Sequence, residues 1–152
     1  MTTRLILIVA LSIASTAALA MGPPTTSSRS SPPSSYEKGA KAAKSGEYAA
    51  ALKQLEKAVG ENSRDANTWN YMGYSYRKLK QFDQALFAYQ KALAIDPEHH
   101  GANEYLGELY LETGKLEKAK ERLKVLDSAC FFGCREYDSL KSAIAAYKAK
   151  HK

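Results

Sequence analysis

The sequence lacks the short motifs that mark many enzymes. It contains no Gly-x-x-x-x-Gly-Lys-Ser/Thr phosphate loop, no Gly-x-Gly-x-x-Gly turn, no His-Glu-x-x-His pair and no Gly-x-Ser-x-Gly nucleophile turn. Paired carboxylates are frequent, but they alternate with lysines, as they do on a solvated helix surface. We therefore expect a protein that is not an enzyme and that holds neither a cofactor nor a metal ion.

Beyond the segment 1–20, no apolar run is long enough to cross a bilayer. The segment itself has the features of a secretory signal peptide. Arg4 supplies the positive start, an apolar stretch follows, and Ala18-Leu19-Ala20 forms a small-x-small cleavage site. We expect export to a bacterial periplasm, or secretion, with removal of this segment; an uncleaved anchor is the alternative. The absence of an Asn-x-Ser/Thr sequon is compatible with a bacterial envelope.

A strong excess of one charge is also missing. The chain has 22 basic and 16 acidic residues, a formal charge of +6. Removal of the signal segment takes away one arginine and no acid, which leaves +5. Because basic and acidic residues are interleaved, this charge is typical of solvated helix faces, and we expect no nucleic-acid partner.

Cysteine is scarce, since Cys130 and Cys134 are the only two. In an exported protein such a pair is normally a disulfide. Residues four apart in a continuous helix have Cβ atoms about 5–6 Å apart, whereas a disulfide needs about 3.5–4.5 Å. Either the helix breaks near Gly133 or the thiols stay free. A structural disulfide is the first interpretation; a redox couple or part of a soft-metal site is the alternative.

Proline is nearly absent after residue 33. Four of the five prolines lie in the segment 21–35, which is rich in serine and threonine and has almost nothing to bury, so we predict a disordered spacer there. From residue 36 the composition changes to Ala, Leu, Lys, Glu and Tyr, with apolar residues at three- and four-residue spacings. The segment 36–150 is therefore predicted to be one helical domain.

Small residues recur with a fixed period in this helical domain. Three glycines and three alanines each repeat every thirty-four residues, and they are Gly39, Gly73, Gly107, Ala51, Ala85 and Ala119. A turn separates each glycine from its alanine, so we expect three helical hairpins. The small residues would let paired helices approach closely. Large aromatic residues would fill the wider gaps to the next hairpin, and they are Trp69, Tyr76, Phe82 and Tyr89.

The middle hairpin resembles the tetratricopeptide-repeat family. The residues that carry the resemblance are Trp69, Met72-Gly73, Tyr76, Ala85, Tyr89, Ala92 and Pro97. The outer hairpins depart from this pattern, because Ser35 and Asn103 stand where the middle hairpin has its tryptophan. The resemblance implies an all-α solenoid of three repeats, at about 34–65, 66–99 and 100–131, closed by an amphipathic capping helix at about 135–149.

The resemblance also implies where a partner binds. In tetratricopeptide arrays the first helices of the hairpins line a concave face that takes an extended or helical segment of another protein. The candidate partner-binding residues are Tyr36, Asn70, Tyr74, Arg77, Lys78, Glu104, Glu108 and Glu112. They run from tyrosine-rich to acidic, so we expect a partner with basic and apolar side chains. A solvated face neutralised by Lys141 and Lys148 is the alternative.

The resemblance does not extend to one known mode of binding. Chaperone-binding members hold an acidic peptide terminus with a clamp of Lys, Asn and Arg. At the corresponding places this chain has Tyr36, Ala40, Tyr71, Gly101 and Tyr105. We therefore do not expect acidic C-terminal peptides as ligands.

Together these features predict a non-catalytic adaptor or scaffold of the cell envelope that binds a protein or peptide as a monomer or homodimer. Two alternatives stay open. One is a redox or metal-handling accessory protein that uses Cys130 and Cys134, and the other is an oligomerisation module in which the first repeat packs on another copy. His99 and His100 are expected to be two exposed loop residues.

Overall fold

The computed structural model describes residues 34–151, which form seven α-helices. The helices are α1 (Ser35–Lys44), α2 (Tyr48–Glu61), α3 (Ala66–Lys78), α4 (Phe82–Ile95), α5 (His100–Glu112), α6 (Leu116–Ala129) and α7 (Arg135–Lys150). The predicted signal segment 1–20 and all but the last two residues of the predicted spacer 21–35 lie outside the described residues. Within residues 34–151, no helix has both the length and the apolar character needed to cross a membrane.

Side-chain caps determine where α1 and α3 begin. The Ser34 hydroxyl accepts a hydrogen bond from the Glu37 amide at 3.2 Å, and the Glu37 carboxylate accepts one from the Ser34 amide at 2.7 Å. The Asp65 carboxylate accepts from two amides of α3 at 3.1 and 3.2 Å. Because of the first cap, the last two residues of the predicted spacer belong to the start of α1.

The turns inside the three hairpins share one backbone conformation. Gly46 and Gly114 have φ angles of 83° and 74°, and Lys80 has the equivalent position with a φ of 62°. This left-handed region costs an ordinary residue roughly 1–2 kcal/mol, whereas glycine adopts it freely. The repeat therefore keeps its turn geometry in the middle hairpin even without glycine.

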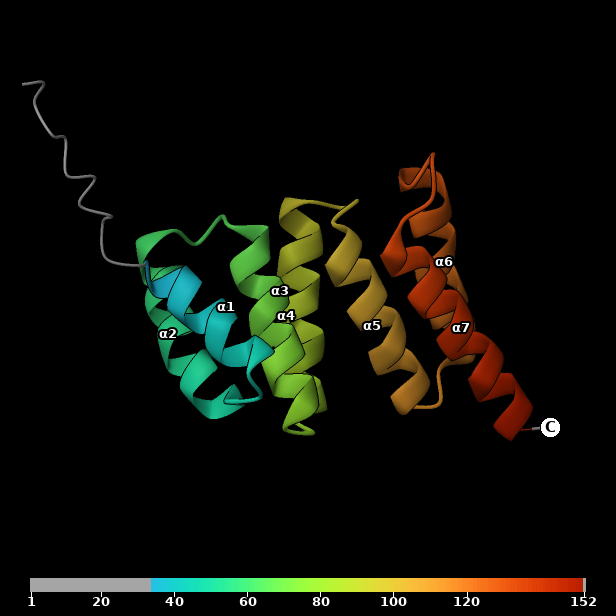
Figure 1. Ribbon diagram of the computed structural model, residues 1–152, viewed down its shortest axis with the longest axis horizontal. Helices are drawn as coiled ribbons and strands as arrows, with labels where there is room; N and C mark the ends of the chain where they lie inside the picture. The colour runs from blue at the N-terminus through green and yellow to red at the C-terminus, as the bar shows by residue number, and fades with distance from the viewer. Residues whose placement is uncertain (1–33, 152) are drawn as a thin grey trace, which may run out of the picture. The chain divides into compact units, whose positions relative to one another are not determined.

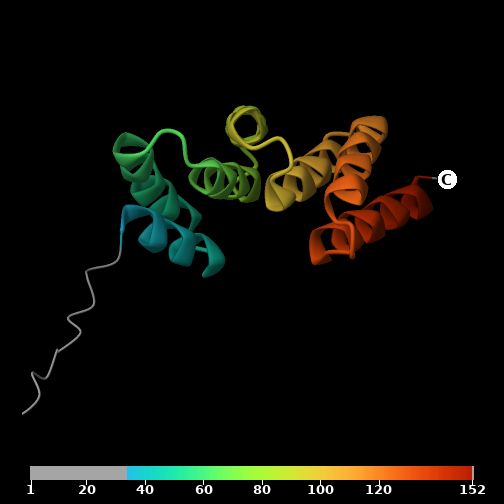
Figure 2. The ribbon, with the colours of Figure 1, turned by 90° about the horizontal axis from the view of Figure 1, so that it is seen from above.

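The helices pack in chain order as three hairpins followed by α7 (Figure 1). Viewed from above, α1, α3, α5 and α7 lie along the inner side of the described unit, and α2, α4 and α6 lie along the outer side (Figure 2). Three apolar clusters fill the spaces between them, one centred on Leu55, one on Tyr89 and one on Leu140. The prediction of an all-α solenoid of three hairpins with a capping helix is confirmed.

The repeating glycines mark the closest helix contacts. A Cβ atom on Gly39 would lie 2.6 Å from Leu55 Cγ, and one on Gly73 would lie 2.5 Å from Tyr89 Cε1. Both distances are far shorter than van der Waals contact, so only glycine permits these helices to approach this closely. Gly107 has a different neighbour, because its Cβ would lie 2.5 Å from Leu140 Cδ2 of α7. Gly107 therefore permits the close approach of α5 to the capping helix α7, and not of α5 to α6.

Tyr89 fills the gap to the next hairpin, as predicted, and it also packs within its own hairpin. Its side chain is fully buried and lies over Gly73 within its own hairpin. The same side chain belongs to the cluster that contains Leu106 and Leu109 of α5. Tyr89 therefore joins α3, α4 and α5, because its ring is long enough to reach both neighbours of its helix.

Candidate partner-binding surface

Four tyrosines lie across the first helices of the three hairpins, and we call them the tyrosine row: Tyr36, Tyr71, Tyr74 and Tyr105. The rings of Tyr36 and Tyr71 meet edge to face with centroids 6.0 Å apart. The rings of Tyr74 and Tyr105 are 5.0 Å apart. All four residues are only partly buried. The row therefore offers aromatic surface from α1, α3 and α5.

The phenol groups of Tyr36, Tyr74 and Tyr105 stay protonated at neutral pH. Burial raises the pKa of Tyr36 and Tyr74, and it raises the pKa of Tyr105 to about 12, with a smaller contribution from the neighbouring Glu104. A neutral hydroxyl both donates and accepts hydrogen bonds. The row can thus make polar contacts as well as apolar ones.

Two lysines lie over rings of the row. The Lys44 ammonium is 5.6 Å from the centre of the Tyr71 ring, and the Lys78 ammonium is 5.3 Å from the centre of the Tyr74 ring. Both lysines are exposed, so these cation–π contacts contribute about 0.5–1 kcal/mol each at most. The α1 and α3 part of the surface is therefore basic and aromatic.

Arg77 forms the charged centre of the surface. Its guanidinium bonds the Glu108 and Glu112 carboxylates of α5, each at 2.5 Å, and Lys80 bonds Glu112 at 2.9 Å. The Arg77 side chain is only 4% exposed, whereas those of Glu108 and Glu112 are 26% and 28% exposed. Arg77 therefore joins α3 to α5 and is not free to bind a partner.

The ionisation of this cluster follows from its contacts. Burial tends to lower the pKa of Arg77, but Tyr89, Glu108 and Glu112 outweigh burial and raise it. Burial tends to raise the pKa of Glu112, and the bonds from Lys80 and Arg77 outweigh it and lower the pKa. Arg77 and Glu112 are therefore both charged at neutral pH.

Glu104 differs from the other two α5 glutamates, because it is only 6% exposed. Burial raises the pKa of its carboxyl group. A hydrogen bond with the Ser139 side chain opposes this rise, and the charge of Glu108 adds to it. Asn70 is also buried, at 5% exposed, and its amide lies 3.0 Å from the place where a Cβ of Gly101 would be. Neither side chain offers much surface to a partner.

Replacing Glu104 by glutamine is expected to stabilise the fold by roughly 1 kcal/mol or less at pH 7. The raised pKa means that ionised Glu104 destabilises the native state at pH values above that pKa. The advantage of Glu104→Gln over the wild type should shrink as the pH falls through the raised pKa. It should vanish below the unfolded value of about 4.3.

Urea unfolding at pH 7 and pH 3.5 measures both stabilities. Glu117→Gln on the exposed start of α6 is the control, because its side chain is 77% exposed. A Glu104→Gln variant that is less stable than the wild type at pH 7 would contradict the expectation.

The structure brings most of the predicted residues to one surface, but it leaves them unequally accessible. Tyr36 and Tyr74 are partly exposed and Lys78 is exposed. Asn70, Arg77 and Glu104 are buried by neighbouring helices. Glu108 and Glu112 form their ion pairs with Arg77 and Lys80. The alternative interpretation had instead assigned the neutralising charges to Lys141 and Lys148.

Two residues of the tyrosine row were missing from the predicted set. Tyr71 and Tyr105 are thirty-four residues apart and so hold the same place in successive repeats. A search for large residues shared between repeats would have found them. Both residues were named only at the positions of the absent peptide clamp and were not counted as contact residues.

Cys130 and Cys134 are joined by a disulfide with Cα atoms 5.6 Å apart. Cys130 ends α6, and Cys134 precedes α7 and accepts a hydrogen bond from the Tyr137 amide at 3.4 Å. Gly133 has a φ of 83° and lets the chain reverse between them. The helix therefore breaks at this point, as a disulfide over so short a separation requires.

His99 does not have the exposed position that was predicted for it. Its Nδ1 accepts a hydrogen bond from the Ala102 amide at 3.1 Å, and its Nε2 lies 3.2 Å from the Asn67 Oδ1. Burial lowers its pKa. His99 thus caps α5 as a neutral ring, whereas His100 is exposed as predicted.

Known proteins share the repeat and the fold. Two family models, both described as tetratricopeptide repeat, match residues 66–99 and 88–121. The uncharacterized protein ycf37 of Guillardia theta is 36% identical over 74 residues, which are 49% of this chain and 39% of that protein. The human PEX5-related protein is 27% identical over 92 residues, which are 60% of this chain and 15% of that protein. This chain thus spans well under half the length of these curated relatives.

Solved structures of other proteins are similar in fold. The type III secretion chaperone SycD of Yersinia enterocolitica, in complex with a peptide of the translocator YopD, has a TM-score of 0.65 at 20% identity, over 78% of this chain and 92% of that chain. MamA of Desulfovibrio magneticus RS-1, from residue 41 to its end, has a TM-score of 0.58 at 32% identity, over 61% of this chain and 53% of that chain. Both likenesses show a shared fold.

Proposed function

We propose that this chain, a member of the tetratricopeptide-repeat family, is a non-catalytic adaptor. It binds a segment of another protein along the first helices of the three hairpins, which are α1, α3 and α5. The observation that carries the proposal is the tyrosine row, in which partly exposed rings follow one another across α1, α3 and α5. Tyrosine contributes large, rigid contact area at little entropic cost and is enriched at binding hot spots.

The solved structures of similar fold support a peptide as the ligand. The Yersinia chaperone was solved with a translocator peptide, and PcrH, with a TM-score of 0.67 and 17% identity, was solved with the chaperone-binding region of PopD. A segment of another protein is therefore a ligand that this fold accommodates, and we extend that mode of binding to this chain.

We propose that apolar side chains of the partner supply most of the affinity. Glu108 and Glu112 are already neutralised by Arg77 and Lys80, so each has little remaining attraction for a basic partner. The rings of the tyrosine row make only weak cation–π and ring–ring contacts within the chain, and all four stay partly exposed. A partner segment with apolar residues, and with few basic ones near α5, fits this distribution, and its binding should depend only weakly on salt.

We further propose that the chain acts outside the cytoplasm, in a bacterial periplasm or after secretion, and as part of an envelope assembly. The signal-like segment 1–20 supports this location. The disulfide between Cys130 and Cys134 supports it as well, because disulfides persist in oxidising compartments.

The chain offers a matched test of the binding face. Lys78 lies over Tyr74 on the proposed face, and Lys91 of α4 lies over Phe87, each at 5.3 Å. We expect Tyr74→Ala to weaken capture of the partner roughly tenfold or more, because a ring at the centre of an interface is worth more than about 1.4 kcal/mol. Phe87→Ala removes a 53% exposed ring from an outer helix and should leave capture unchanged.

Affinity capture from envelope extract, with each purified variant as bait and quantitative mass spectrometry as the readout, measures the effect. Circular dichroism confirms that both variants fold. Equal capture by wild type and Tyr74→Ala would refute the proposed face. Loss of capture by Phe87→Ala alone would move the binding site to the outer helices.

A further inference from the structure

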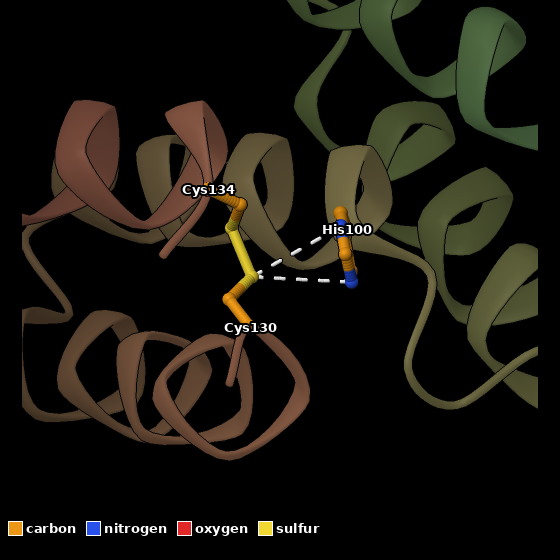
Figure 3. Close-up of side chains that lie close together, drawn as sticks. All are labelled: His100, Cys130 and Cys134. Atoms are coloured by element: carbon orange, nitrogen blue, oxygen red, sulfur yellow. Dashed lines mark hydrogen bonds between the residues drawn. A yellow bond between two sulfur atoms is a disulfide. The ribbon is translucent and has the colours of Figure 1, made fainter. Parts of the chain in front are cut away.

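Three side chains with metal-ligating atoms meet at the end of the molecule where α5 begins, α6 ends and α7 begins. They are His100, Cys130 and Cys134, and their ligand atoms all lie within 4.8 Å of one another (Figure 3). The Cys130 sulfur is 3.9 Å from Nε2 and 4.0 Å from Nδ1 of His100. None of the three residues belongs to the tyrosine row.

We propose that reduction of the Cys130–Cys134 disulfide creates a metal site here, in which the two thiolates and the His100 imidazole hold a thiophilic ion of the zinc(II) class. Two sulfur ligands and one imidazole nitrogen are a ligand set that tetrahedral zinc accepts, with a fourth position left for water or for a side chain of a partner. In the disulfide form the sulfurs carry no charge and the site does not exist.

The distances suit this ligand set. With Zn–S bonds of about 2.3 Å and Zn–N bonds of about 2.0 Å, tetrahedral angles place a sulfur and a nitrogen about 3.5 Å apart. The distance from the Cys130 sulfur to His100 exceeds this by less than about half an ångström. His100 is the exposed first residue of α5, so its ring can turn toward the metal without leaving a packed core. A rotation of the His100 side chain is therefore sufficient for the imidazole, and the two sulfurs move apart to separate ligand positions once the disulfide is reduced.

The helix dipole and one hydrogen bond at Cys134 favour the reduced, metal-binding form. The Cys134 sulfur is the N-cap of α7 and accepts the Tyr137 amide, a position where the helix dipole stabilises a thiolate. His99 cannot take the place of His100, because both of its ring nitrogens already have partners in the cap and Asn67. The site thus has one defined imidazole ligand.

The redox step balances with an external dithiol as the reductant. The dithiol gives two electrons and two protons to the disulfide and is itself oxidised to a disulfide, which leaves Cys130 and Cys134 as thiols. Metal binding then releases the two thiol protons to solvent as the thiolates form. After loss of the metal, an external disulfide takes two electrons and two protons from Cys130 and Cys134 and becomes a dithiol, which restores the Cys130–Cys134 disulfide. Whether the site can bind metal therefore depends on the balance of dithiols and disulfides around the protein.

The test uses purified protein reduced with dithiothreitol, freed of the reductant by anaerobic gel filtration, and titrated with Co²⁺ and then Zn²⁺. We expect one equivalent of Co²⁺ to give thiolate-to-metal charge-transfer absorption, and Zn²⁺ to displace it. His100→Ala should lower the affinity roughly tenfold or more, since even outer-shell ligand partners contribute that much. Protein that was never reduced should give no such absorption.

His99→Asn is the matched control, because asparagine preserves the N-cap of α5 while removing the neighbouring imidazole. It should bind Co²⁺ as tightly as the reduced wild type. Reduced wild type that gives no charge-transfer band would overturn the proposal. Equal Co²⁺ affinities of reduced His100→Ala and reduced His99→Asn would also overturn it, because His100 would then not be a ligand of the metal. Both results are independent of partner capture by the tyrosine row.

Discussion

Gly73→Ala is expected to destabilise the protein by about 1–3 kcal/mol, although alanine is the better helix former. The added methyl carbon would lie 2.5 Å from Cε1 and 2.6 Å from Cδ1 of Tyr89. Tyr89 is fully buried against Leu106 and Leu109, so its ring has no free space into which it could move. The methyl group can be accommodated only if α3 and α4 separate, which opens gaps along their whole contact.

Gly60→Ala is the matched control for this substitution. Gly60 lies in α2, and a Cβ there would meet nothing within 4 Å. Alanine should therefore stabilise the helix by up to about 1 kcal/mol at this position. Urea denaturation of the wild type and the two variants, followed by circular dichroism, gives the three free energies of unfolding. If Gly73→Ala were as stable as Gly60→Ala, the close contact of α3 with Tyr89 would not exist in solution.

The period of thirty-four residues made the hairpins predictable, because a glycine is required wherever two helices approach too closely for a Cβ. The sequence alone could not indicate that Gly107 contacts Leu140. The capping helix has no counterpart among the repeats, so no register relates its residues to those of α5. Its amphipathic pattern predicts a buried face, but only the folded chain shows which neighbour that face contacts.

The binding surface was predictable in its place and not in its detail. Repeat register puts Tyr74, Arg77 and Glu108 on the first helices, and the structure agrees. Whether such a side chain is free depends on pairing across helices, and Arg77 is held by residues that follow it by 31 and 35 positions. Ion pairs at such separations depend on the exact rotation of each helix, which residue spacing does not reveal.

The two adjacent histidines illustrate the same limit. His99 and His100 are indistinguishable as residue types, yet one caps α5 and the other lies beside the disulfide. Successive residues at a helix start point in directions about a quarter-turn or more apart, so a shift of one residue in the start of α5 would exchange their surroundings. Only the position of the N-cap separates a structural histidine from a candidate ligand.

The cross-helix role of Arg77 leads to the second large effect. Arg77→Met is expected to destabilise the fold by about 2–3 kcal/mol at pH 7, somewhat below the range for a fully buried pair because both glutamates keep some contact with water. Methionine preserves much of the apolar volume between Tyr74 and Tyr105, whose rings lie 5.9 Å and 5.6 Å from the guanidinium. The main change is thus the loss of the positive charge between two carboxylates.

Lys80→Met is the control within the same cluster. Lys80 bonds the same Glu112 carboxylate, but its side chain is 71% exposed, so its removal should cost no more than about 1 kcal/mol. A loss from Lys80→Met as large as that from Arg77→Met would mean that burial of the cation does not matter here.

The pH dependence separates the charge of Arg77 from its packing. The pKa of Glu112 is lowered in the native state, so its ionisation stabilises the wild type fully above the unfolded value of about 4.3, and this stabilisation is lost as the pH falls through the lowered pKa. Arg77→Met removes one source of that lowering. The difference in unfolding free energy between wild type and Arg77→Met should therefore be largest at pH 7 and should shrink steadily toward pH 3. A difference that is the same at both pH values would assign the effect to packing, and Arg77 would then join α3 to α5 by its volume rather than by its charge.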